Sequence, residues 1–183
     1  MRLTRSEAVL VVIDVQERLM PVIHDRFEVE RNAERLVRGA PLLGVPVIVT
    51  EQYVKGLGPT VEPLRIALEE SGGYRPIEKQ CFSAHGCDAF AAQLAALERK
   101  QIIVAGVETH VCVYQTVRDL LAAGSAVWVA ADAVSSRTAR NRDIALQRMT
   151  ADGARLTSAE MALFELLGVA GNDEFRAVSR LVK

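Results

Sequence analysis

Short, almost uninterrupted apolar runs alternate with longer amphipathic stretches, and this alternation restricts the possible fold more than any other feature of the chain. Four runs rich in β-branched residues are predicted to be strands: Ala8–Ile13, Pro46–Thr50, Gln101–Ala105 and Ser125–Ala131. A strand that is apolar on both sides fits a sheet with helices on both faces. A weaker strand is predicted at Pro76–Lys79, mainly from its position between helical stretches.

The stretches between these runs have the period of amphipathic helices. They are Arg26–Leu43, Asp88–Arg99 and Val111–Ala123. Gly44 and Gly124 follow two of them, where a left-handed cap residue is expected. Thr157 and Glu160 have the spacing of a capping box for a later helix that ends at Leu167.

Repeated strand–helix–strand units imply right-handed parallel crossovers. We therefore predict an α/β fold with three layers, α/β/α, around a central, mostly parallel sheet in a Rossmann-like arrangement. A chain of 183 residues fits one domain over residues 1–183.

Charge and composition exclude several classes of protein. The 22 basic and 23 acidic residues give a net charge of −1, which predicts no nucleic-acid partner. No apolar run approaches the roughly 20 residues that span a membrane, and Ala8–Ile13 is too short for the core of a secretory signal. The three cysteines cannot all pair with one another, which fits a reducing compartment. We expect a cytoplasmic protein whose partner is a small-molecule substrate.

Three reactive side chains are predicted to meet at one edge of the sheet, because open α/β sheets bind ligands at the carboxyl ends of their strands. Asp14 follows the first strand, Lys79 ends the weak strand, and Cys112 lies shortly after the strand that ends at Ala105. The loop Glu51–Thr60 and Asp132 belong to the same edge, and for Asp132 we expect a turn-capping role.

Each reactive residue also has an ordinary structural interpretation. Asp14 could only cap a turn, Lys79 could be a solvated charge, and Cys112 could be an apolar core residue. Cys112 is predicted in the first turn of a helix, where the positive end of the helix dipole favours a thiolate.

Together, a thiol, a carboxylate and an ammonium group can carry out acyl transfer. The carboxylate takes the thiol proton as a general base, and the lysine keeps the carboxylate ionised and oriented. Backbone N–H groups at the helix start can hold the oxyanion that forms when sulfur attacks a carbonyl. The product is a thioester that water hydrolyses.

The segments Val11–Gln16 (VVIDVQ) and Ala105–Val113 (AGVETHVCV), with Lys79 between them, resemble the isochorismatase-like cysteine hydrolases. That superfamily includes nicotinamidases and N-carbamoylsarcosine amidases, and the resemblance extends from Ala8 to about Leu167.

The resemblance implies a catalytic triad of Asp14, Lys79 and Cys112. It also implies a non-proline cis peptide bond between Val107 and Glu108, with the amides of Glu108 and Cys112 as the oxyanion hole. We therefore expect a hydrolase that cleaves a small amide-like or related C–N substrate through a Cys112 thioester, without a cofactor.

The sequence departs from two branches of this superfamily. Nicotinamidases have an Asp-x-His pair for a metal where this chain has Thr50–Tyr53, which lacks histidine. We therefore expect no metal. True isochorismatases often lack the cysteine, because vinyl-ether hydrolysis needs no nucleophile, so Cys112 favours acyl chemistry. The segments Thr50–Tyr53, Cys81–His85 and Asp152–Glu160 are most similar to the isochorismatase-domain-containing subgroup of bacteria and animals.

Four further residues are candidate substrate contacts. Gln16 could bind a polar edge of the substrate, Tyr53 and Phe82 could form apolar walls, and His85 could touch it directly. The alternative for each is ordinary packing or solvent exposure.

Other functions remain open from the residues alone. Cys81, His85, Cys87, His110 and Cys112 offer zinc ligands, but their spacing matches no pair of zinc knuckles. A non-catalytic scaffold, a redox sensor in which Cys81 or Cys87 resolves oxidised Cys112, and an ether hydrolase of the isochorismatase type are the remaining alternatives. The apolar C-terminal helices and the modest charge favour a homo-oligomer, as in relatives.

Overall fold

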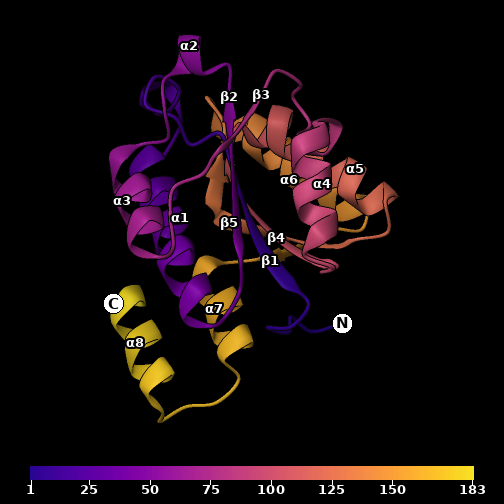
Figure 1. Cartoon of the computed structure of the whole chain (residues 1–183). Helices are drawn as coiled ribbons and strands as arrows, with labels where there is room; N and C mark the ends of the chain where they lie inside the picture. Colours follow the sequence, from indigo (N-terminus) through magenta and orange to yellow (C-terminus); the bar gives the residue numbers. More distant parts are fainter.

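Six parallel strands form one sheet in the computed structural model, which describes residues 1–183 (Figure 1). Their spatial order is β3-β2-β1-β4-β5-β6. The strands are β1 (Ala8–Ile13), β2 (Val47–Gln52), β3 (Ile77–Lys79), β4 (Gln101–Val107), β5 (Ala126–Ser135) and β6 (Arg155–Thr157). Every neighbouring pair is parallel, so all strands end at the same edge.

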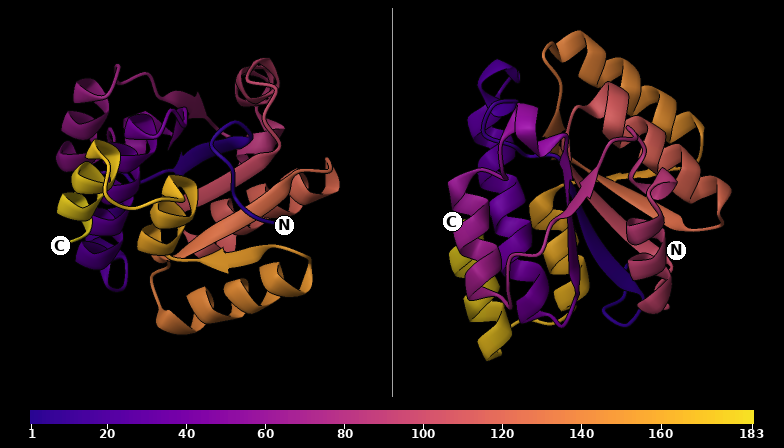
Figure 2. Two further views of the ribbon diagram at one scale, coloured as in Figure 1. Left: turned by 90° about the horizontal axis from the view of Figure 1, so that it is seen from below. Right: turned by 45° about the horizontal axis from the view of Figure 1, so that its top comes forward.

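Helices cover both faces of the sheet, which confirms the predicted three-layer fold (Figure 2). One face carries α1 (Arg26–Leu42), α3 (Glu62–Glu70), α7 (Ala159–Leu167) and α8 (Asp173–Val182). The other carries α4 (Asp88–Ala96), α5 (Tyr114–Ala122) and α6 (Ala139–Ala151). Short helices lie in the loops: α2 (Val54–Leu57), two 3-10 turns (Met20–Val22, Ala84–Gly86) and a π-helical turn, Thr109–Val113. No helix is both long and apolar enough to span a membrane.

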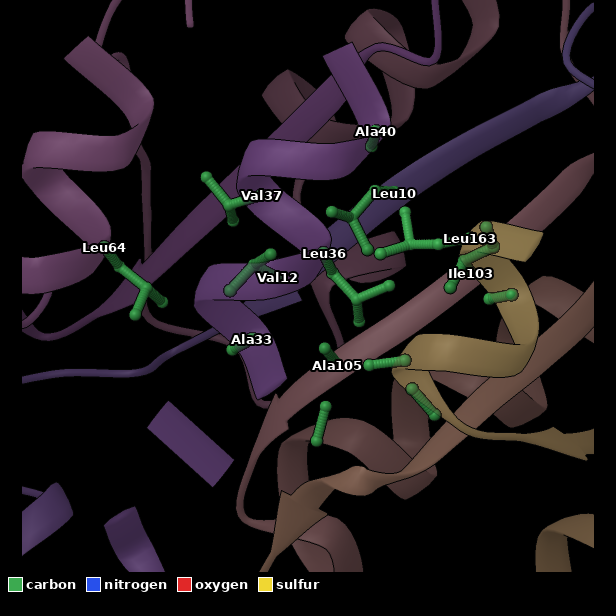
Figure 3. Packing of buried hydrophobic residues seen from close by; sticks show 14 of the residues in the cluster. Leu10, Val12, Ala33, Leu36, Val37, Ala40, Leu64, Ile103, Ala105 and Leu163 are labelled. Atoms are coloured by element: carbon green, nitrogen blue, oxygen red, sulfur yellow. The ribbon is translucent and has the colours of Figure 1, made fainter. Parts of the chain in front are cut away.

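Strand β1 shows why the apolar runs are continuous. Successive side chains point to opposite faces of a sheet. Leu10 and Val12 therefore pack on the α1 side, where Figure 3 shows them beside Leu36 and Val37. Their neighbours Val9, Val11 and Ile13 pack on the opposite side with α4 and α5. Because both faces are covered, no position in the strand is left for a polar residue.

Gly106 brings β4 close to β1 at the end where Asp14 follows. Its φ is +119°, and a Cβ at this position would overlap the backbone of its partner in the register, Ile13. Only glycine combines this backbone conformation with so close an approach.

One helix was not predicted and one predicted helix cap is wrong, both for local reasons. Helix α6 was not predicted, because it buries only Ala145 and Met149 and has no wide apolar stripe. The N-cap of α7 is Ser158, whose hydroxyl accepts a hydrogen bond from the Met161 N–H; Thr157 belongs to the three-residue edge strand β6.

The predicted loop Glu51–Thr60 also differs from the structure. Its first two residues continue β2, and Val54–Leu57 form α2. Strand β5 continues to Ser135, so Asp132 lies inside a strand rather than at its end. The Asp132 carboxylate accepts a hydrogen bond from the Ala159 N–H at 2.8 Å and thereby caps α7, a helix distant in the sequence.

Candidate active site

The Asp14 carboxylate lies at the carboxyl-terminal edge of the sheet, between Thr50 and Lys79. It follows β1 directly, and its φ of +54° is a left-handed conformation that is uncommon outside glycine. The side chain is fully buried. One carboxylate oxygen accepts a hydrogen bond from the Thr50 hydroxyl of β2 at 2.7 Å. The other lies 2.7 Å from Lys79 Nζ. The two oxygens therefore have partners from two other strands, β2 and β3.

Lys79 ends β3, and its ammonium group is buried among oxygen atoms. Besides Asp14, Nζ donates to Gln52 Oε1 at 2.7 Å and to the carbonyls of Phe82 and Cys81 at 3.2 and 3.3 Å. A buried charge is tolerated only where it is paired and hydrogen-bonded, and Lys79 is both. This geometry excludes the alternative of a solvated surface charge.

Cys112 lies in the π-helical turn that joins β4 to α5, and it is only 7% exposed. Burial and the negative charge of Asp14 raise the pKa of the Cys112 thiol to about 12, although the charge of Lys79 opposes the shift. At neutral pH the sulfur therefore carries its proton, because burial opposes the thiolate that the start of the helix was expected to favour.

Thr116, a residue that the sequence did not single out, ties this turn to the segment after β3. Its hydroxyl donates to the Cys112 carbonyl at 2.7 Å and accepts from the Ala84 N–H at 2.8 Å. The hydroxyl thus connects the π-helical turn that contains Cys112 to the segment that carries the Cys81 and Phe82 carbonyls around Lys79.

Glu108 directly precedes the π-helical turn, and the peptide bond between Val107 and Glu108 is cis. No hydrogen bond within the protein uses the Glu108 N–H. The Glu108 side chain, by contrast, is engaged: Oε2 accepts hydrogen bonds from both the backbone N–H and Nε of Arg137, each at 3.0 Å.

Gln16 does not have a free amide for a substrate. Its Nε2 donates to the carbonyls of Gln52 and Gly58 at 2.9 and 2.7 Å, and its Oε1 accepts from the Gln52 N–H at 2.8 Å. The structure therefore assigns Gln16 to holding the segment around α2, in place of the predicted substrate contact.

Gln52 is the other site residue that the sequence did not single out. Its Oε1 accepts from Lys79 Nζ, and its Nε2 donates to the Gln80 carbonyl at 2.8 Å. It ends β2, so the strand-end rule that found Asp14 and Lys79 also applies to it.

Of the remaining predicted contacts, Tyr53 and Phe82 are exposed and His85 is half-buried. Tyr53 is 52% exposed and follows Gln52, which contacts Lys79; Phe82 is 55% exposed, although its carbonyl accepts a hydrogen bond from Lys79. His85 lines a cavity of about 400 Å³ with residues of α4 and the segment after it, and no member of the predicted triad lines this cavity. The structure thus brings Asp14 and Lys79 together near the Cys112 thiol, whereas His85 lies elsewhere.

Buried polar atoms near the site are not all satisfied. The hydroxyls of Ser83 and Thr109 have no hydrogen-bond partner in the protein. Ser83 follows the carbonyls that surround Lys79, and Thr109 follows Glu108. No three His, Cys, Asp or Glu side chains are grouped so that they could hold one metal ion, and all three cysteines are free thiols.

Comparison with known proteins gives matches along nearly the whole chain. The family model of the isochorismatase domain matches residues 8–161. The secreted isochorismatase effector Isc1 of Phytophthora sojae (strain P6497) is 40% identical over 183 residues, which cover 100% of this chain and 87% of that protein. Isochorismatase domain-containing protein 2 of Bos taurus is 37% identical over 183 residues, covering 100% and 86%.

Solved structures share the fold. A MAR1 ribonuclease from Caenorhabditis elegans has a TM-score of 0.90 and 36% identity, and the match covers 100% of this chain and 92% of that chain. The YcaC gene product of Escherichia coli, described as an octameric hydrolase of unknown specificity, has a TM-score of 0.91 and 26% identity, covering 99% and 89%.

Proposed function

The chain belongs to the isochorismatase domain family, as its motifs predicted, and we propose that it is a cysteine hydrolase that cleaves a C–N bond of a small amide-like substrate. The observation that carries the proposal is the buried ion pair of Asp14 and Lys79, whose two charges both act on the Cys112 thiol. Such an arrangement activates a nucleophile and has no evident use in a scaffold.

The protonated resting thiol is compatible with this chemistry. Loss of the proton to solvent would leave two negative charges, on Asp14 and on sulfur, next to one Lys79 cation. Transfer of the same proton to Asp14 leaves one negative charge beside that cation, so the net charge of the site is unchanged. We therefore assign Asp14 as the general base and Lys79 as the group that stabilises the thiolate formed during attack.

Attack then follows the usual course of acyl transfer. The Cys112 sulfur bonds to the substrate carbonyl carbon, and the N–H groups of Glu108 and Cys112 hold the resulting oxyanion. The intermediate collapses by breaking the C–N bond, and the leaving nitrogen takes the proton from Asp14. A water molecule, deprotonated by Asp14, then attacks the thioester, releasing a carboxylic acid and restoring the thiol.

The presence of Cys112 favours a cysteine hydrolase over an ether hydrolase of the isochorismatase type, because ether hydrolysis needs no nucleophile.

We further propose that the chain forms one domain and assembles as a homo-oligomer; the octameric state described for the E. coli relative supports the assembly. A cytoplasmic location stays a prediction, and the P. sojae relative is described as secreted.

A screen of primary amides, N-carbamoyl amino acids and nicotinamide tests the function. Wild-type protein is expected to release ammonia or an amine from at least one compound, and Cys112→Ala to lose this activity. Cys81→Ala and Cys87→Ala are matched controls that keep it. Mass spectrometry of the intact protein during turnover should show an acyl adduct on Cys112.

Turnover that survives Cys112→Ala would end the thioester mechanism. A single-stranded RNA is included in the screen because one neighbour is named a ribonuclease. RNA cleavage by the wild-type protein in the absence of any amide turnover would replace the proposed function.

A further inference from the structure

The segment that follows β5 is bonded at two points to the residues that follow β4: at Glu108 and at His110 in the π-helical turn that contains Cys112. Val107 of β4 pairs in register with Ser135 of β5, so the residues that follow these strands are neighbours. Arg137 donates two hydrogen bonds to the Glu108 carboxylate, from its backbone N–H and from Nε, and His110 Nδ1 lies 2.9 Å from the Ser136 hydroxyl oxygen.

The Arg137 segment is itself held in place, so it can act as a fixed support. Ser136 is fully buried, and its carbonyl accepts a hydrogen bond from the His24 N–H at 2.9 Å. Thr138 follows as the N-cap of α6, with its hydroxyl accepting from the Asn141 N–H at 3.2 Å. The backbone on both sides of Arg137 is therefore fixed by contacts that do not involve Glu108.

The two groups of Glu108 have different environments. Its side chain is 11% exposed and accepts two charge-assisted hydrogen bonds on one oxygen, from the backbone N–H of Arg137 and from the Arg137 side chain, which is itself 61% exposed. Its N–H has no partner in the protein. A side chain anchored at its far end restricts rotation of the residue, and thus the direction of its unpaired N–H.

We propose that the Glu108 carboxylate and Arg137 are positioning groups that aim the Glu108 N–H at the developing oxyanion. This inference rests on the proposed function and adds to it a role for two side chains that touch no reacting atom. Because an oxyanion donor acts only in the transition state, loss of its alignment should slow acyl transfer without affecting the nucleophile itself.

Two reagents separate these effects without knowledge of the natural substrate. In acylation by p-nitrophenyl acetate, sulfur bonds to the carbonyl carbon, the thiol proton passes to Asp14, and the C–O bond to p-nitrophenolate breaks after an oxyanion has formed. In alkylation by iodoacetamide, the thiol loses its proton, sulfur displaces iodide from a saturated carbon, and no oxyanion forms. The ratio of the two rates at Cys112 therefore reports on the oxyanion hole.

The variants form a graded series, measured in a Cys81→Ser, Cys87→Ser background. Glu108→Ala keeps the backbone N–H but loses both anchoring bonds, and we expect acylation to slow by about tenfold or more. Arg137→Ala loses only the Nε bond and should slow acylation less. Glu108→Gln keeps an acceptor oxygen and should restore most of the rate lost in Glu108→Ala. Alkylation should stay within about twofold of the parent rate in all three.

Arg140 supplies the matched control, because it is an exposed arginine in the first turn of α6. Arg140→Ala should change neither rate. Equal acylation in Glu108→Ala and the parent, or a parallel loss of acylation and alkylation, would overturn the positioning role while leaving the thioester mechanism intact. Acylation that persists in Cys112→Ala, or absence of acylation at Cys112 in the parent, would overturn the proposed function as well.

Discussion

Asp14 and Lys79 form an ion pair in which neither side chain is exposed to solvent, with Oδ2 and Nζ 2.7 Å apart. Asp14 follows β1 and Lys79 ends β3, two strands that are separated by β2, and Thr50 and Gln52 of β2 contribute the bonds that complete the pair. Removal of one partner from such a pair leaves an uncompensated buried charge, which is far more costly than the net contribution of the pair. Because the two residues carry opposite charges, replacing Asp14 and replacing Lys79 should shift the pKa of the Cys112 thiol in opposite directions.

The first prediction concerns the reactivity of Cys112 in those variants. The charge of Asp14 raises the pKa of the thiol and that of Lys79 lowers it. Asp14→Asn should therefore speed alkylation by iodoacetamide at pH 7.5 by about tenfold, and Lys79→Met should slow it. Both variants should lose hydrolytic turnover, because one lacks the base and the other the stabilising cation.

The pH dependence of the parent protein checks the same point. With a thiol pKa of about 12, alkylation by thiolate that has lost its proton to solvent should rise about tenfold per pH unit from pH 7 to 10, whereas alkylation after proton transfer to Asp14 should not change with pH. A rate that levels off below pH 9 would show that Cys112 is already a thiolate near neutral pH.

The second prediction concerns Gln52, which accepts a hydrogen bond from Lys79 and donates one to the Gln80 carbonyl. Gln52→Ala removes an acceptor from the buried ammonium group and should lower kcat on any substrate found in the screen by about tenfold. Gln80→Ala is the matched control, because only the backbone carbonyl of that exposed residue is used. A Gln52→Ala enzyme with unchanged kcat would show that Lys79 is held well enough without it.

The third prediction concerns the close approach of β4 and β1. An added methyl group at Gly106 overlaps the Ile13 backbone, so Gly106→Ala should lower the free energy of unfolding by about 3 kcal/mol or more. Gly124 also has a positive φ, of +85°, but nothing lies within 4 Å of an added Cβ. Gly124→Ala should therefore cost only about 1 kcal/mol. Urea unfolding of both variants measures the difference, and equal losses would contradict the steric argument.

The fourth prediction concerns Asp132, whose carboxyl pKa is raised by burial although the bond from the Ala159 N–H opposes the shift. A raised pKa in the folded protein means that its contribution to stability is present at low pH and is lost as the pH rises through the folded value. Asp132→Asn, which does not titrate, should therefore gain stability relative to the parent between pH 4 and pH 7.

Asp132→Ala provides the contrast, because it loses the bond to the Ala159 N–H at every pH. It should lower the free energy of unfolding by about 1 kcal/mol. Urea unfolding at pH 4 and pH 7 tests both variants, and a stability difference between Asp132→Asn and the parent that does not change with pH would refute the assignment.

The strands of this protein could be predicted because burial on both faces leaves a visible local pattern. In β1 every side chain is buried, so the apolar run ends at Ile13, and the first polar residue, Asp14, marks the strand end. A parallel sheet gathers such ends at one edge, which is why the sequence alone predicts that Asp14 and Lys79 lie close together. Helix α6 and strand β6 leave no such pattern, since most of their side chains face solvent.

The protonation of Cys112 and the hydrogen-bond partners of Gln16 and Glu108, by contrast, depend on contacts between segments that are distant in the chain. The Cys112 sequence favours a thiolate, but the burial that keeps its proton comes from the packing of the sheet and of α4, α5 and α6 around it. The amide of Gln16 is occupied by carbonyls that reach it from the segment around α2, and the Glu108 carboxylate by an arginine at the end of another strand. Desolvation and hydrogen-bond saturation depend on which atoms surround a group in space. Only the tertiary structure determines those neighbours, whereas the local sequence determines which elements form and where they end.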